Sequence, residues 1–521
     1  MKSSRLSGIT IYLQPNTYAC MTRKIIFLLL ATVFIMACRK DNIDTSSGIN
    51  LRFSVDTVTF DTVFTDVGSI TKRLKVFNPS QDRIRISDIQ LAGGDNSNFR
   101  INVDGVNQTQ VSDVEILGKD SIYIFVEATI DPNDLNNPLI VKDSIFFNTN
   151  GNSQDVKLIA WGQDAYVHSP NEEDSIVFKD QNGIPVDTFY FHAVTANERW
   201  DNVKPHLVYG TVIVLNGATL TIDPGTNVHL AHNSNILVEQ NGSLQALGTE
   251  DNPINICGDR LDEFYKDLPG QWGRIWLTQD SQNNRFENTH IKNGTTGIYL
   301  GGLGLLSDGL DLNAKPDLFM KNTIVTNMIR HGLLLQSAEA TIQNTEVSDC
   351  GENNVWMYIG GDYKFTHCTM ANYFGSRQTP MLRMSNFVDI EENNVVVETF
   401  TKDLNATFEN SIIYGSNQNE MIHEITPAAS FEYYFDNCLM KLDADEFDLD
   451  DVSLFKDLTL NENPKFVMTY QARESDYQLD TLSIAKDIAN PSISTALPTD
   501  LLGISRLSDL GPDLGCYERV E

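Results

Sequence analysis

The hexapeptide Phe286-Glu287-Asn288-Thr289-His290-Ile291 is the first copy of a phrase that recurs at irregular intervals up to Met440. Its pattern is a large apolar residue, any residue, Asn, a small residue, any residue and an aliphatic residue. Five further copies follow, at Met320–Val325, Ile342–Val347, Phe365–Met370, Phe408–Ile413 and Phe435–Met440. Only the copy that begins at Phe365 replaces the Asn, with His367.

The spacing of these copies predicts a solenoid of short strands. The shortest interval is 22 residues, from Met320 to Ile342, and insertions explain the longer ones. A repeat of roughly 20 to 30 residues is typical of solenoids. Each copy is too short for a pair of helices, and its apolar residues alternate with polar ones, which favours strands. Stacked coils of such strands form a parallel β-helix.

The repeated Asn has a structural explanation. In stacked coils the same position recurs about 4.8 Å further along the axis, which is the spacing of paired strands. The amides of neighbouring coils can therefore hydrogen-bond one another where the coil bends. We prefer this explanation to a ligand role, and we expect His367 to take the place of one Asn in the row.

Length and charge narrow the class of protein. A chain of 521 residues is expected to hold more than one domain. Its formal net charge of −32 argues against nucleic-acid binding, which needs clustered Lys and Arg. The charge suits an envelope or extracellular protein with a well-solvated surface.

The N-terminus is typical of a secreted lipoprotein. From Met21, the start that we expect, a positive stretch at residues 22–24 precedes an apolar run at residues 25–35 that is too short to span a bilayer. The run ends at Ile35-Met36-Ala37-Cys38, which resembles a lipobox. Acylation of Cys38 would anchor the chain to a membrane without a spanning helix, at the outer membrane or the cell surface. The alternative is a plain signal peptide with an incidental Cys.

The chain divides into six segments. Residues 1–38 comprise a stretch before the expected start at Met21 and then the lipoprotein signal peptide. Residues 39–49 are a tether. Short alternating strands at residues 50–163 predict a β-sandwich, which resembles the immunoglobulin-like spacers of bacterial envelope proteins. Residues 164–207 are a linker with a hairpin, residues 208–470 are the β-helix, and residues 471–521 are a cap on the open edge of its last coil. The predicted fold is therefore all-β.

Three further stretches resemble one family. They are Gly258-Asp259-Arg260-Leu261, the segment from Leu268 to Trp276, and Thr369-Met370-Ala371-Asn372-Tyr373-Phe374. They look like right-handed parallel β-helix lipoproteins of the Gram-negative envelope, over most of the chain from Thr195 onward. The stretches Asp500–Gly503 and Gly511–Glu518 are similar to the terminal motif of many secreted β-helix proteins. The resemblance implies a right-handed helix and a lipid anchor, and it implies no established activity.

Two sets of residues are candidates for catalysis. Asp308 and Asp311 lie in a Gly- and Leu-rich insertion between two copies of the phrase, and a glycosidase needs two carboxylates about 5 to 9.5 Å apart. His367 is the candidate for the base of a lyase, with a place in the Asn row as the preferred alternative. Asp308 and Asp311 lack the paired-aspartate and Gly-His-Gly signatures of pectin-hydrolysing β-helices.

Two other sets are candidates for binding. The acidic run from Asp443 to Asp451 offers oxygen ligands for calcium, although a solvated loop explains it better. Its candidate ligands are Asp443, Asp445, Asp448 and Asp450. Aromatic side chains on a long β face can stack on sugars, and alternation sends some of them into the core. The candidates are Trp356, Tyr358, Tyr363 and Tyr373.

We therefore expect an acylated envelope lipoprotein whose β-helix is a non-catalytic module that binds glycans or another envelope component. The main alternative is a polysaccharide lyase or glycoside hydrolase on the same fold. A third possibility is a structural or adhesive stalk. Convergent carboxylates and a base in one groove would favour the enzyme, and an aromatic strip without them would favour binding.

Overall fold

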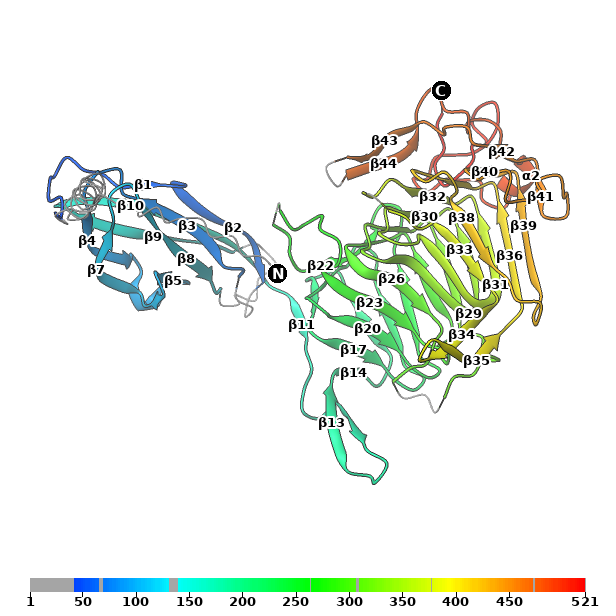
Figure 1. Cartoon of the computed structure of the whole chain (residues 1–521), viewed down its shortest axis with the longest axis horizontal. Coiled ribbons are helices and arrows are strands. Elements are labelled where there is room, and N and C mark those ends of the chain that lie inside the picture. The colour runs from blue at the N-terminus through cyan, green and yellow to red at the C-terminus, as the bar shows by residue number, and fades with distance from the viewer. Residues whose placement is uncertain are drawn as a thin grey trace, which may run out of the picture. The chain divides into compact units, whose positions relative to one another are not determined.

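The computed structural model describes residues 42–64, 69–130, 139–262, 264–305, 309–375, 377–471 and 474–520, and shows an almost entirely β chain (Figure 1). Cys38 and the predicted signal lie outside the described residues. The chain forms two compact units, which divide close to residue 160. None of the described helices has the length and apolarity needed to span a membrane.

The N-terminal unit contains two five-stranded sheets. The first has the order β1 (Arg52–Phe53), β3 (Lys72–Phe77), β8 (Ser121–Ala128), β5 (Phe99–Val103) and β6 (Val106–Asn107), and the second has the order β2 (Thr57–Phe64), β10 (Asn152–Gln163), β9 (Leu139–Thr149), β4 (Ile84–Leu91) and β7 (Gln110–Ile116). The sheets pack face to face, because the ring of Phe53 in the first lies 4.8 Å from that of Phe147 in the second. Alternate residues of each strand enter this core. The unit is therefore an antiparallel β-sandwich.

The C-terminal unit is a parallel β-helix with three faces, and this confirms the predicted fold class. The first face consists of β14 (His192–Val194), β17 (Thr211–Val214), β20 (Asn235–Val238), β23 (Trp272–Leu277), β26 (Gly294–Leu300), the first halves of β29 (His331–Gln343) and β31 (Val355–Thr366), β33 (Leu382–Ser385) and β38 (Met421–Glu424). The second face consists of β15 (Glu198–Trp200), β18 (Thr219–Ile222), β21 (Ser243–Leu247), β24 (Asn284–Glu287), β27 (Asp317–Lys321), the second halves of β29 and β31, β36 (Leu404–Glu409), β39 (Phe431–Asp436) and β41 (Phe455–Lys456). The third face consists of β11 (Tyr166–His168), β16 (His206–Val208), β19 (Asn227–Leu230), β22 (Ile254–Gly258), β25 (Thr289–Lys292), β28 (Ile324–Thr326), β30 (Glu346–Ser348), β32 (Thr369–Asn372), β37 (Ile412–Gly415), β40 (Leu439–Met440) and β42 (Thr459–Leu460).

Parallel pairing begins before residue 208, where the sequence analysis placed the start of the solenoid. Strand β11 pairs with β16, and β14 pairs with β17, both in parallel register. The segment 164–207 therefore contains the first coil as well as the expected hairpin, β12 (Ser175–Lys179) with β13 (Pro185–Tyr190). These first strands have only three residues each, too few for a periodic pattern to identify them.

Each copy of the repeated phrase spans the corner between the second and third faces. The Asn stands at the bend with a positive φ, 44° at Asn288 and 50° at Asn322, and His367 adopts the same conformation with φ 52°. Asn322 Nδ2 donates to Asn288 Oδ1 at 3.3 Å, and Asn344 Nδ2 donates to Asn322 Oδ1 at 3.2 Å. These hydrogen bonds confirm the predicted row of stacked amides.

The first residue of each copy points into the core. The rings of Phe365, Phe408 and Phe435 stack along the axis with centroids 5.0 Å and 4.5 Å apart, and the rings are nearly parallel. Cys368 and Cys438 are buried free thiols beside this stack, as the sequence predicts. The core is therefore continuous from coil to coil.

The C-terminal segment lies along the side of the solenoid. It includes the hairpin of β43 (Phe466–Gln471) with β44 (Glu474–Leu479) and the short helix α2 (Pro491–Ser494). Its backbone carbonyls accept hydrogen bonds from Asn344, Asn410 and Asn437 of the amide row, and its side chains pack on the outer surface of the third face. The segment thus covers the flank of several coils, whereas the sequence analysis expected it to cap only the last one. The segment follows the flank because it supplies hydrogen-bond partners to the corner amides of more than one coil.

Candidate functional site

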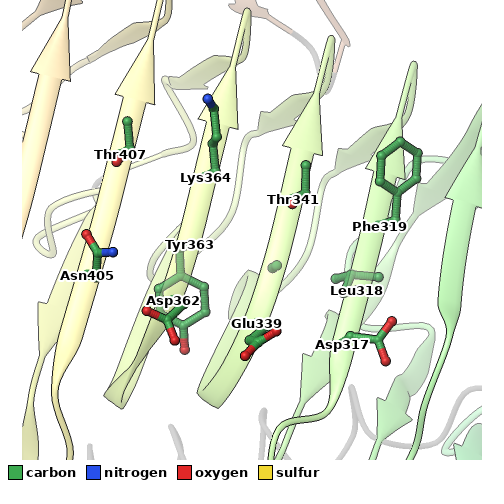
Figure 2. Close-up of a pocket in the computed structure, with 11 residues that line it drawn as sticks. Asp317, Leu318, Phe319, Glu339, Thr341, Asp362, Tyr363, Lys364, Asn405 and Thr407 are labelled. Atoms are coloured by element: carbon green, nitrogen blue, oxygen red, sulfur yellow. The ribbon is translucent and has the colours of Figure 1, made fainter.

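A groove of about 530 Å³ crosses the outer surface of the second face (Figure 2). Four neighbouring strand segments form its floor, from β27, β29, β31 and β36, so it runs across the strands along the solenoid axis. Three strand spacings of about 4.8 Å give a floor about 14 Å long. The lining residues are Asp317, Leu318, Phe319, Glu339, Ala340, Thr341, Asp362, Tyr363, Lys364, Asn405 and Thr407.

Parallel register places like positions of successive coils side by side. Asp317 pairs with Glu339, and Glu339 pairs with Asp362, so three carboxylates form a row that Asn405 continues. Figure 2 shows these side chains along one edge of the groove. A second row runs two residues further along each strand and contains Phe319, Thr341, Lys364 and Thr407. Both rows point outward because the residues between them enter the core.

Lysine side chains neutralise part of this charge. Lys315 Nζ lies 2.5 Å from Glu339 Oε1 and 3.8 Å from Asp362 Oδ2. Lys364, within the second row, forms an ion pair with Glu409 at 3.1 Å. The groove therefore carries charges of both signs, with the carboxylates gathered on one side.

Lys402 is a partly buried basic group on which these carboxylates act. Burial lowers its pKa, and the positive charge of Lys315 lowers it further, while Asp362, Asp311 and Glu339 act in the opposite direction. Its ammonium donates to the backbone carbonyls of Ser337, at 2.9 Å, and Ala314, at 3.4 Å. These bonds stabilise the protonated form and hold the segment that bears Lys315 against the solenoid.

The groove offers hydrogen-bond partners for hydroxyl groups. Carboxylate and amide oxygens accept hydrogen bonds, threonine hydroxyls and lysine ammonium groups donate them, and Phe319 offers an apolar ring. The Glu339 and Asp362 side chains are 45% and 56% exposed, so water solvates both carboxylates. A general acid needs a less solvated setting that holds its proton. The arrangement therefore favours binding over acid catalysis.

The structure separates the catalytic candidates of the sequence analysis. Asp311 is exposed close to the groove, where its charge acts on Lys402, and Asp308 lies outside the described residues. His367 is fully buried in the amide row, where its Nε2 lies 2.8 Å from Ser494 Oγ and its Nδ1 lies 3.2 Å from the Gly515 carbonyl. Burial lowers its pKa well below the usual value, so the ring is neutral. The structure does not bring His367 to the groove.

The acidic run is a surface segment whose carboxylates bind nearby backbone groups. Asp443 Oδ1 accepts from the amide of Asp445 at 3.1 Å, and Asp448 and Asp450 are exposed. Among the described residues, the one group of three or more potential metal ligands within 4.8 Å of one another lies elsewhere, at His168, His192 and Glu198.

The aromatic candidates fall into two classes. Trp356 and Tyr358 are half-buried on the outer surface of the first face, with the Arg383 guanidinium 4.4 Å above the Trp356 ring. Tyr363 is buried, and its hydroxyl donates to the Gly360 carbonyl at 2.7 Å, while Tyr373 stacks on Tyr477 of the C-terminal segment. An outward row on the first face also contains Trp276, Tyr299 and Leu334, in register with Trp356. An aromatic strip and a carboxylate row thus occupy different faces.

The carboxylate row was not among the sites predicted from the sequence, although its signal lies just upstream of the repeated phrase. Asp317, Glu339 and Asp362 each stand three residues before the first residue of a copy. Asn405 and Glu432 stand at the same position in the next two copies. An alignment extended upstream of the phrase would have shown a recurrent polar position that faces outward.

The first coils of the solenoid resemble a known family in sequence. A family model described as a pectate-lyase-like beta helix domain matches residues 193–304. The match ends before β27, the first strand of the groove floor. No curated protein matches the chain in sequence.

Three solved structures show distant likeness. The catalytic unit of a thermostable GH87 alpha-1,3-glucanase from Streptomyces thermodiastaticus covers 75% of this chain and 90% of its own, with 9% identity and a TM-score of 0.15. A family 123 glycoside hydrolase from Clostridium perfringens covers 23% of this chain and 30% of its own, with 8% identity and a TM-score of 0.16. The major pilin subunit of Bacillus cereus covers 27% of this chain and 52% of its own, with 12% identity and a TM-score of 0.15. This chain therefore spans less than two thirds of the last two proteins, and TM-scores this low carry no argument about function.

Proposed function

We propose that the chain is a glycan-binding β-helix and that the groove on its second face holds the glycan. The observation that carries this proposal is the in-register row of Asp317, Glu339, Asp362 and Asn405 in an open groove across four coils. A polysaccharide is a chain of repeated sugar units. A row of hydrogen-bonding groups that repeats along the solenoid axis can therefore contact successive sugars. The row supplies acceptors for hydroxyl groups at regular steps of about 4.8 Å.

The charge of the row points to a class of glycan. Three carboxylates on one edge repel a polyuronate and attract amino groups. We therefore infer that the groove takes a neutral or amino-sugar chain.

We also propose that the β-helix is held at the outer membrane or cell surface by acylated Cys38. The lipobox-like stretch from Ile35 to Cys38 supports the anchor. The antiparallel sandwich supports a spacer of immunoglobulin-like type between the anchor and the solenoid. Calcium has no part in this proposal.

A glycan array on the purified full chain tests the proposed binding. It should contain neutral, amino-sugar and uronic polysaccharides, with a variant that carries Asp317→Asn, Glu339→Gln and Asp362→Asn beside the wild type. We expect hits among neutral or amino-sugar glycans that disappear in the variant. Hits that persist in the variant, or hits confined to polyuronates, would refute the proposal.

Glycoside hydrolysis in the same groove is the second candidate function. It is favoured by the three carboxylates. The backbone positions of neighbours in the row lie about 4.8 Å apart and those of the outer two about 10 Å apart, and these spacings bracket the carboxyl separations that glycosidases use. The half-buried Lys402 beside them is a further basic group. A reducing-end assay on every array hit distinguishes the two functions, because binding alone releases no new reducing ends.

A further inference from the structure

Three potential metal ligands meet in the first coil of the solenoid. His168 ends β11 on the third face, His192 begins β14 on the first face, and Glu198 begins β15 on the second face. One ligand atom of each lies within 4.8 Å of the other two. Side chains from all three faces of the coil therefore lie close together at this point.

A chain of hydrogen bonds fixes the protons of the histidines. His206 Nε2 lies 3.0 Å from the Asp201 carbonyl, which can only accept, so Nε2 carries the proton and His206 Nδ1 is an acceptor. His168 Nε2 lies 2.9 Å from that Nδ1 and must therefore donate to it. The remaining nitrogen, His168 Nδ1, therefore bears the lone pair of this ring. Histidines that bind metals are oriented in the same way, through a hydrogen bond from the other ring nitrogen.

This lone pair points toward a second imidazole nitrogen, which can donate a hydrogen bond to it when no metal is bound. His168 Nδ1 lies 3.4 Å from His192 Nε2, and the two rings are inclined at 68°. With zinc–nitrogen distances of about 2.05 Å, this separation of 3.4 Å corresponds to an N–Zn–N angle of about 112°. That angle is close to the tetrahedral value.

The third ligand is also held in place. Trp200 Nε1 donates to Glu198 Oε1 at 2.8 Å, and the buried Trp200 ring stacks on His168 with centroids 4.3 Å apart. His168 and Glu198 also line a pocket of about 200 Å³. This pocket has room for a water molecule that could complete the coordination of an ion.

We propose that His168, His192 and Glu198 bind one divalent transition-metal ion, for which Zn²⁺ is the best fit, and that this ion joins the three faces of the first coil. Two imidazoles and one carboxylate suit zinc, whereas calcium prefers oxygen ligands alone. Such a link would stabilise a coil at the end of the stack, where β11, β14 and β15 pair with the next coil through three residues each.

Metal titration of the EDTA-treated full chain tests the site. We expect Co²⁺ to give visible d–d absorption that saturates at one equivalent per chain and is abolished by Zn²⁺. We also expect Zn²⁺ to raise the melting temperature. No saturable Co²⁺ spectrum and no Zn²⁺-dependent shift of the melting temperature would overturn the proposal.

Variants assign the site to these residues. Glu198→Gln keeps an oxygen for the Trp200 indole and removes the charge, and His192→Gln removes one imidazole, so each should weaken Zn²⁺ binding by more than 100-fold. His206→Phe removes the acceptor that orients His168 and should weaken binding by about 10- to 100-fold. The control His232→Gln changes an exposed histidine outside the cluster and should leave the affinity unchanged. Equal affinity in the control, Glu198→Gln and His192→Gln would refute the assignment.

Discussion

Arg506 Nη2 donates to Asn344 Oδ1 at 3.1 Å, across 162 residues of sequence. Asn344 belongs to the amide row at the corner of the solenoid, and Arg506 belongs to the C-terminal segment. The same guanidinium lies 3.2 Å from Glu518 Oε2, and both side chains of this ion pair are fully buried. One hydrogen-bonded cluster therefore joins the repeat to the segment that covers its flank.

Replacement of Arg506 should destabilise the protein strongly. Arg506→Met leaves Glu518 buried without its partner, and the loss of one member of a buried ion pair costs about 3 to 5 kcal/mol. Urea denaturation followed by circular dichroism measures the change. Arg330→Met is a control, because its pair with Glu352 is exposed and is expected to contribute less than about 1 kcal/mol. A cost below about 1 kcal/mol for Arg506→Met would contradict this account of the cluster.

Substitutions of Asn410 can separate two contributions to the free energy of unfolding, that of its backbone conformation and that of its amide hydrogen bonds. Its φ is 49°, and its amide contacts His367, Asn437 and Asn490. Asn410→Gly should cost about 2 kcal/mol because it removes these hydrogen bonds. Asn410→Ala should cost about 1 kcal/mol more, because a left-handed backbone is unfavourable for alanine. Equal free energies of unfolding for the two variants would show that the positive φ contributes nothing.

Glu346 should make the stability depend on pH. Burial raises its pKa to about 7, although the hydroxyls of Ser348 and Tyr517 hydrogen-bond to it. The folded chain therefore holds a proton that the unfolded chain releases above about pH 4.5. The contribution of Glu346 to the free energy of unfolding is complete below about pH 4.5. Up to about 3 kcal/mol of it is lost as the pH rises to about 7.

The variant Glu346→Gln isolates this effect. It removes the titration, so its free energy of unfolding should fall less than that of the wild type between pH 4.5 and 7.5. Glu518, with a pKa raised to about 7, and Asp513, with a pKa raised to about 6, remain in both proteins and cancel in the comparison. Identical pH profiles would mean that the Glu346 carboxyl is not the titrating group.

The repeated phrase predicted the fold and the amide row because both depend on local periodicity. Each copy contains its own strand alternation and its own corner Asn, so residues such as Asn288 and Asn322 identify their place without any long-range information. Parallel stacking then follows from the repeat. The free, buried state of Cys368 followed from the same register.

Local periodicity could not predict the contacts of the C-terminal segment. It could not predict those within the first coil either. Arg506 lies 162 residues from its partner Asn344, and no pattern in the sequence relates them. His168, His192 and Glu198 lie in strands of three residues each, which show no periodicity. The groove was missed for a different reason, since its carboxylates do recur at a fixed place before the phrase, but their meaning depends on which face of the coil turns outward.

Calorimetric titration of an oligosaccharide from the array tests whether the groove binds a glycan. The wild-type chain should bind, and the variant with Asp317→Asn, Glu339→Gln and Asp362→Asn should lose at least tenfold in affinity. A control with the same change of charge, Glu172→Gln, Glu173→Gln and Asp187→Asn, alters exposed residues around the β12–β13 hairpin and should bind as the wild type does. Equal affinity of all three proteins, or loss only after Trp356→Ala on the first face, would contradict the claim and move the site away from the groove.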